Sequence, residues 1–187
     1  SEEEYDAVID GIYESERYAH TEKTRQIREL LYDYCEIAVN TGIRPGTEME
    51  SITWGDIELK AQGSKAQFFI NVRKGKTTKH TGTRTVVCKD EIYFALTELQ
   101  ERFPDRKPTD KLFRLADGSP TKELGRTFSA ALTEAGLKSA TEKSKNSDEK
   151  QEVLEEPRSL YSLRHTYITW QLLSKELRID ILARQCG

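Results

Sequence analysis

The amino-acid sequence predicts an α+β domain that is mostly helical and contains a small three-stranded antiparallel sheet. Apolar residues recur at helical spacing over residues 1–40 and 160–187, whereas β-forming residues alternate with polar ones between them. The chain has 187 residues, and its hydrophobic fraction of 36% suits one globular domain around a single core.

Two amphipathic helices are expected at the start of the chain. Ser1 and Glu4 have the spacing of a capping box. The apolar residues that follow recur every three or four positions: Tyr5, Val8, Ile9 and Ile12. Residues 21–40 repeat this pattern, and the following Gly42 suits the left-handed position at which helices end.

Three strands and then further helices are expected after Trp54. The strands are DIEL, QFFINV and TRTVVC, separated by the turn-forming segments AQGSK and KGKTTKHTG. Asp90 is expected to cap a helix over residues 91–103, and Thr121 to cap another that runs to Gly136. Residues 138–156 are nearly all polar and predict a flexible loop, with a charged solvated helix over part of it as the alternative.

Composition limits the classes of function. The formal net charge is −3, so a nucleic-acid-binding protein of this sequence must concentrate its positive charge on one face. No apolar run reaches the length of a membrane span, and the first residues are acidic, so we expect an intracellular protein with no membrane partner. Cys35, Cys88 and Cys186 have no metal-site or disulfide spacing, and no cofactor is expected.

Two arginines lie in segments that could fix a guanidinium in one direction. Arg44 follows a helix end in TGIRPG, where glycine and proline constrain the backbone. Arg164 lies in the largely apolar segment SLYSLRHTYITW, so its charge needs a partner or an anion. Taken singly, each also fits a plain role, as a surface arginine or as a salt-bridged one.

The expected hairpin between the second and third strands is strongly basic. Its cationic residues are Arg73, Lys74, Lys76, Lys79 and Arg84. Such a hairpin could reach a phosphate backbone, although charged hairpins are often only solvated sheet edges.

The order and context of these residues resemble the catalytic domain of tyrosine recombinases, the phage-integrase family. TGIRPGTEMESITWGDIEL is similar to the family's first arginine motif, and KGKTTKHTGTRTVV to its lysine-bearing β-hairpin. SLYSLRHTYITWQLL, followed by DILARQCG, is similar to the second arginine motif and the helix after it. The resemblance covers nearly the whole chain and implies the tyrosine-recombinase catalytic fold over residues 1–187.

The resemblance also implies roles for the site residues. Arg44 and Arg164 would clamp the scissile phosphate, and Lys76 would be the general acid for the leaving 5′-oxygen, with Lys74 as the alternative. Planar guanidiniums bind phosphate oxygens bidentately and stabilise the negative charge that spreads in phosphoryl transfer. Contacts to duplex DNA are expected from the remaining cations of the hairpin: Arg73, Lys74, Lys79 and Arg84.

Three departures from the family pattern stand out. Tyr161 occupies the position of the usual histidine three residues before the second arginine; it can still donate a hydrogen bond, while His165 is expected to pack and support. Glu48 follows Arg44 by four residues, one more than is typical, which a longer loop should absorb. The family's nucleophilic tyrosine would lie after Gly187 and its core-binding domain before Ser1, so we expect a truncated domain that does not cleave DNA alone.

The resemblance implies site-specific DNA recombination by the parent protein, the integration or excision of a mobile element through a 3′-phosphotyrosyl intermediate. The expected partners are double-stranded DNA, other recombinase protomers in a synaptic assembly and accessory DNA-bending proteins, in the cytoplasm of a bacterial host. A type IB topoisomerase activity and a non-catalytic DNA-binding role are the alternatives.

Overall fold

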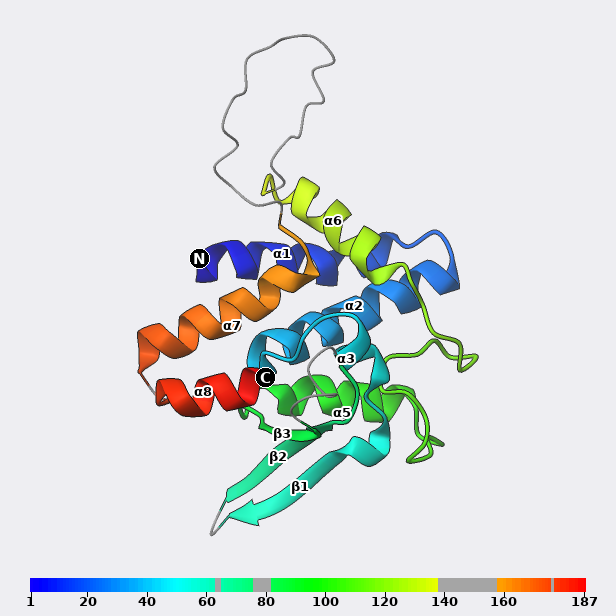
Figure 1. The fold of residues 1–187 in the computed structure, drawn as a ribbon. Helices are drawn as coiled ribbons and strands as arrows, with labels where there is room; N and C mark the ends of the chain where they lie inside the picture. The colour runs from blue at the N-terminus through cyan, green and yellow to red at the C-terminus, as the bar shows by residue number, and fades with distance from the viewer. Residues whose placement is uncertain (63–64, 76–81, 138–157, 176) are drawn as a thin grey trace, which may run out of the picture.

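The computed structural model describes residues 1–62, 65–75, 82–137, 158–175 and 177–187 (Figure 1). In chain order its elements are α1 (Glu2–Ser15), η1 (Glu16–Tyr18), α2 (Glu22–Thr41), α3 (Thr47–Ser51), η2 (Trp54–Asp56), β1 (Ile57–Gln62), β2 (Lys65–Val72), β3 (Arg84–Val87), α5 (Ile92–Arg102), α6 (Leu124–Glu134), α7 (Leu160–Ser174) and α8 (Ile179–Cys186). The predicted class, mostly helical with a small antiparallel sheet, is confirmed.

The long helix α2 is the centre of the fold. It contacts α1, α5, α6 and α7, and its apolar face is fully buried. Its start and end follow from the sequence: the Thr21 side chain accepts the backbone N–H of Thr24, and Gly42 ends the helix in the left-handed conformation. The capping box of Ser1 and Glu4 likewise starts α1. The well-packed and well-capped helix α2 therefore fixes the position of the loop that follows Gly42.

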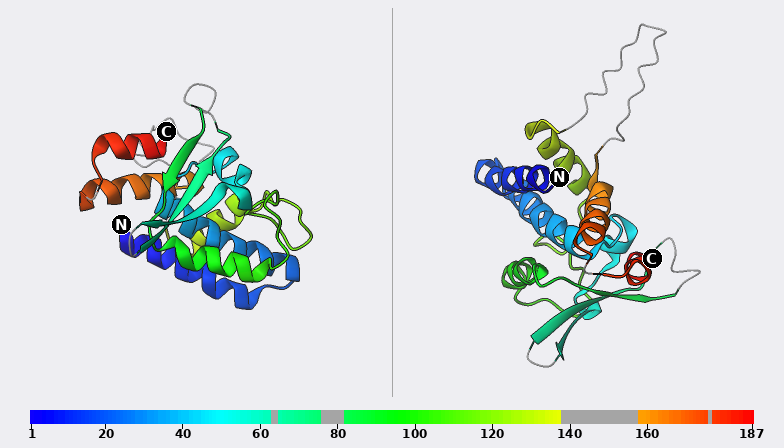
Figure 2. Two further views of the ribbon diagram at one scale, coloured as in Figure 1. Left: turned by 90° about the horizontal axis from the view of Figure 1, so that it is seen from below. Right: turned by 90° about the vertical axis from the view of Figure 1, so that its left-hand side faces the viewer.

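The sheet lies at the end of the molecule away from α1 and α6, as Figures 1 and 2 show. Its order is β1-β2-β3, all antiparallel, with Ile57 opposite Ile70 and Ile70 opposite Val86. Ile70 and Val86 are buried, which sets the register because a slip by one residue would expose them. The outer edge of β3 faces α8.

Two predicted helix starts differ from the structure, and one predicted segment is not described. Helix α5 begins at Ile92 and has no side-chain cap, because the preceding turn uses backbone carbonyls: Tyr93 N–H donates to the Asp90 carbonyl. The Thr121 hydroxyl accepts from Glu123 N–H, but α6 begins only at Leu124 and ends at Glu134, before Gly136. The flexible loop predicted over residues 138–156 lies outside the described residues.

Cys35, Cys88 and Cys186 are free thiols and are buried. Within the described part of the chain, no helix combines the length and the apolar character that a membrane crossing needs.

The turn after α2 is packed against α7. Gly42 has φ +65°, and a Cβ placed there would lie 2.3 Å from Cδ1 of Tyr167. Gly136, which follows α6, also has a positive φ of +69° but faces open space. The two glycines therefore separate the cost of backbone strain from the cost of a steric collision.

We predict that Gly42→Ala destabilises the protein more than Gly136→Ala does. Both substitutions force alanine into the left-handed region, at a cost of about 1 kcal/mol. Only Gly42→Ala also collides with a buried ring, which adds about 1–3 kcal/mol. Urea unfolding of the two variants would measure the difference, and equal losses of unfolding free energy would contradict the packing described here.

Candidate phosphate-binding site

Arg44 projects from the short loop between α2 and α3. Its backbone N–H donates to Oε2 of Glu48 at 3.2 Å, and the hydroxyl of Tyr34 accepts the N–H of Gly46 at 3.2 Å. Glu48 lies in the first turn of α3 and folds back onto Arg44. The Arg44 side chain keeps 20% of its exposure, so it is fixed but accessible.

Glu48 is a buried carboxylate between two arginines from different elements. Only 2% of it is exposed. Its Oε1 accepts from Nη1 of Arg44 at 3.4 Å and its Oε2 from Nη2 of Arg84 at 2.5 Å. A buried charge needs such partners, so Glu48 joins the Arg44 loop to strand β3.

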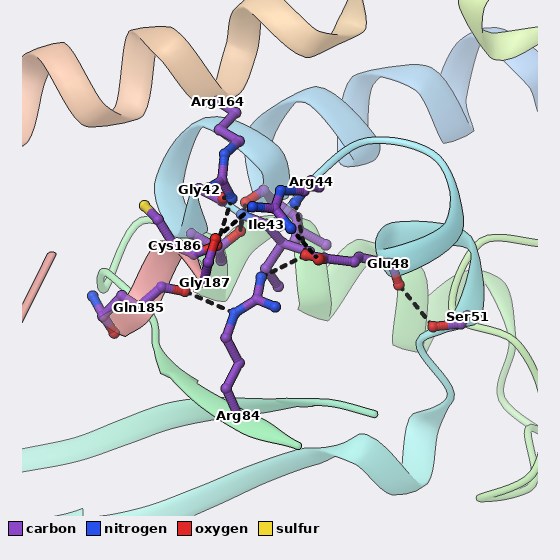
Figure 3. A network of polar contacts seen from close by, with 12 residues as sticks. Gly42, Ile43, Arg44, Glu48, Ser51, Arg84, Arg164, Gln185, Cys186 and Gly187 are labelled. Atoms are coloured by element: carbon purple, nitrogen blue, oxygen red, sulfur yellow. Dashed lines mark hydrogen bonds and ion pairs between the residues drawn. The ribbon is translucent and has the colours of Figure 1, made fainter. Parts of the chain in front are cut away.

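Three arginines donate hydrogen bonds to consecutive carbonyl groups at the end of α8 (Figure 3). Arg84 donates from Nε to the Gln185 carbonyl at 2.9 Å. Arg164 donates from Nη1 to the Cys186 carbonyl at 2.8 Å, and Arg44 from Nη2 to the Gly187 carbonyl at 2.5 Å. Carbonyls in the last turn of a helix lack intrahelical partners and carry partial negative charge, so they attract cations.

Arg164 is the most enclosed of these arginines. It is 6% exposed, and its Nη1 also donates to the Gly42 carbonyl at 2.7 Å. Burial lowers the pKa of the guanidinium, and the nearby positive charge of Arg44 also lowers it. Arginine pKa values lie so far above neutrality that Arg164 stays charged. Arg44 and Arg164, which the sequence predicts to act together, are therefore brought to one place.

Gly75 ties the base of the basic hairpin to this site. A Cβ at this position would lie 2.6 Å from both Cγ and Oε1 of Glu48. Lys74, the alternative general acid, directly precedes Gly75 and is exposed. Lys76 directly follows it, and both Lys76 and Lys79 lie outside the described residues.

The other two arginines predicted to contact DNA already have partners within the chain. The guanidinium of Arg73 pairs with the carboxylate of Asp56 at the start of the sheet, although its side chain stays 60% exposed. Arg84 is only 12% exposed and is directed toward Glu48 and α8. Arg84 thus belongs to the arginine cluster beside Arg44 and Arg164.

Tyr161 lies one turn before His165 on α7, and the two rings pack edge to face with centroids 5.1 Å apart. Both side chains are exposed, with Tyr161 at 44%. Tyr161 precedes Arg164 by three positions on α7, so the two residues lie on neighbouring turns of one helix face. Tyr161 therefore stands at the rim of the arginine cluster.

The sequence alone did not identify Gln185 or the role of Arg84 in the cluster. A signal for Gln185 exists in DILARQCG, where Leu182, Gln185 and Cys186 share one helical face, and all three are buried. A polar side chain on a buried face needs hydrogen-bond partners. No comparable local signal distinguishes Arg84 from the other cations of the hairpin.

The fold of this chain matches solved structures over its full length. The XerA recombinase structure aligns over 100% of this chain with a TM-score of 0.63 and 20% identity. The chain has the tyrosine-recombinase catalytic fold. The lambda integrase catalytic core aligns over 99% of this chain and 92% of its own length, with a TM-score of 0.60 and 15% identity.

The match is to part of the larger recombinases. The chain spans 55% of the XerA chain and 45% of the XerH site-specific recombinase, whose structure is a pre-cleavage complex with its difH substrate; the XerH match has a TM-score of 0.63 and 21% identity. No family model and no curated protein sequence matches the chain. The likeness to tyrosine recombinases is therefore one of fold.

We predict that Gly75→Ala displaces the hairpin base because the added methyl group collides with Glu48, which two arginines hold in place. The expected loss in unfolding free energy is about 1–3 kcal/mol. Gly11→Ala is the matched control, since Gly11 lies in α1 with open space around it, and alanine there should stabilise by about 0.5–1 kcal/mol. In a Glu48→Asp background the shorter side chain should reduce the Gly75→Ala loss, and strict additivity in thermal unfolding would refute the contact.

Proposed function

We propose that this chain is the phosphate-binding part of a site-specific DNA recombinase that acts through a 3′-phosphotyrosyl intermediate. The observation that supports it most is the convergence of Arg44 and Arg164 on the last turn of α8, although they lie far apart in the sequence. Three arginines and one glutamate leave this cluster with a net positive charge, inside a chain whose total charge is −3. That arrangement favours an anionic ligand.

The geometry of Arg164 supports a role as one half of a phosphate clamp. Among the described residues, both hydrogen bonds of its guanidinium start from Nη1, so the Nε and Nη2 edge is left to a ligand. One edge of a guanidinium can bind two oxygens of a phosphate at once. Arg44 would contribute from the neighbouring loop, and together they would stabilise the charge that develops as the phosphodiester reacts.

A hairpin lysine is the proposed general acid for the leaving 5′-oxygen. The resemblance favours Lys76, with Lys74 as the alternative, and both flank Gly75, which contacts Glu48. Tyr161 would donate a hydrogen bond to the phosphate from the rim. Arg73, Lys74, Lys79 and Arg84 are proposed to add positive charge along the DNA, with Arg84 acting from within the cluster.

The tyrosines that lie near Arg44 and Arg164 are not proposed as the attacking nucleophile. Tyr34 and Tyr167, which contact the loop that carries Arg44, are buried and use their hydroxyls to accept hydrogen bonds from Gly46 and Gln185. Tyr161 is assigned to hydrogen bonding. The chain alone would then bind DNA without cleaving it.

Duplex DNA and further recombinase protomers are the proposed partners. XerH was solved with its difH substrate, and a lambda integrase dimer was solved on a COC' core site. An exchange of strands between two such sites needs more than one protomer. Integration or excision of a mobile element is the proposed context.

We predict that this chain binds duplex DNA at low salt and that Arg164→Lys weakens the binding about tenfold. Lysine keeps the positive charge but loses the planar fork, at a cost comparable to one charged hydrogen bond. Fluorescence anisotropy over a salt series should show the wild-type affinity falling by about 0.9 log units per log unit of salt for each phosphate contact.

Arg126→Ala is the control, because the Arg126 side chain on α6 is 87% exposed and lies outside the cluster. It should leave the affinity within about twofold, as expected for a surface substitution worth less than ~0.5 kcal/mol. The proposal fails if wild-type binding is absent at low salt, or if Arg126→Ala and Arg164→Lys have equal effects while both variants stay folded.

A further inference from the structure

We infer that Gln185 is a positioning residue that holds the arginine cluster together by fixing the last turn of α8. The inference rests on the proposed phosphate-binding function and assigns the cluster a supporting residue outside the arginines themselves. Gln185 is 6% exposed, and its side chain contacts two other elements. Its backbone carbonyl is one of the three that accept arginine hydrogen bonds.

The first contact fixes α8 to the sheet. Oε1 of Gln185 accepts the backbone N–H of Val87 at 2.7 Å. Val87 is in β3, which pairs with β2 on its other edge, so the amide oxygen satisfies a group on the open edge of the sheet. Arg84, three residues earlier on the same strand, is thereby kept opposite the carbonyl of Gln185.

The second contact fixes α8 to α7. Nε2 of Gln185 donates to the hydroxyl of Tyr167 at 3.0 Å, and both groups are buried. The Tyr167 ring packs against Gly42, whose carbonyl accepts from Arg164 and which lies two residues before Arg44. One amide therefore connects the three elements that carry Arg84, Arg164 and Arg44.

The arginines need this support because like charges close together repel each other. Carbonyl groups offset the repulsion only while the last turn of α8 stays in reach of all three guanidiniums. Helix α8 is short and, apart from Leu182, Gln185 and Cys186, mostly exposed, so apolar packing alone gives little orientation. A buried polar contact with both partners satisfied specifies one arrangement.

The test is Gln185→Met, which keeps the volume of the side chain and removes both hydrogen bonds. We expect duplex DNA to bind about tenfold more weakly, the equivalent of one charged hydrogen bond. The slope of log affinity against log salt should also become shallower by about 0.9 for each phosphate group that the variant no longer binds. A residue that only stabilises the fold would lower the melting temperature and leave the slope of the folded protein unchanged.

Gln171→Met is the matched control. Gln171 is a buried glutamine on α7 whose Nε2 has no partner in the described part of the chain, so its replacement should leave the salt slope unchanged. Tyr167→Phe removes only the link to α7 and serves as the second variant if Gln185→Met does not fold. It should shift the slope in the same direction as Gln185→Met.

The outcomes separate the two proposals. If the wild-type chain shows no salt-dependent binding, the phosphate-binding function fails and the role of Gln185 fails with it. If the wild type binds as proposed but Gln185→Met, or Tyr167→Phe in its place, keeps the wild-type slope, only the positioning role is overturned. A shallower slope in the variant, with Gln171→Met unchanged, supports it.

Discussion

The site depends on the attraction between the carbonyl end of one short helix and three guanidiniums from three other elements. Arg84, Arg164 and Arg44 donate to the carbonyls of residues 185, 186 and 187 in turn. Helix ends carry unsatisfied carbonyls in any protein, and here arginines replace water as their partners. The positive charges are held at close range before any ligand arrives, which would remove part of the cost of organising the proposed phosphate site.

The carboxylate of Glu48 offsets part of the positive charge of the three arginines. This one buried carboxylate, shared by Arg44 and Arg84, reduces the repulsion between the guanidiniums in the free protein and leaves the cluster with a net positive charge. A second buried carboxylate would cancel most of the positive charge of the three arginines. Without any carboxylate, the guanidiniums would repel each other. Since Gly75 packs against the same side chain, the carboxylate that orients the arginines also contacts the chain at the end of β2.

Local patterns in the sequence predicted most of the fold. Thr21 and Gly42 bound α2 as expected, and the register of the sheet follows from which residues alternate into the core. The Asp90 cap was wrong because a backbone turn satisfied the same N–H groups, a choice that depends on how the chain leaves β3. Motif order identified Arg44 and Arg164, and the structure brings them together.

What the sequence could not supply is the set of contacts between elements. In the sequence, Arg84 resembles the other cations of the basic hairpin. Its side chain is largely buried because α8 packs against β3. Gln185 shows the same limit: helical spacing places it on a buried face, yet its partners come from a strand and from another helix. Because its partners come from different elements, the cluster requires β3, α7 and α8 to be in place together. A neutral amide suits position 185 because it can accept a hydrogen bond from a backbone N–H and donate one to a hydroxyl at the same time. It does so without changing the net charge that the cluster presents to an anion.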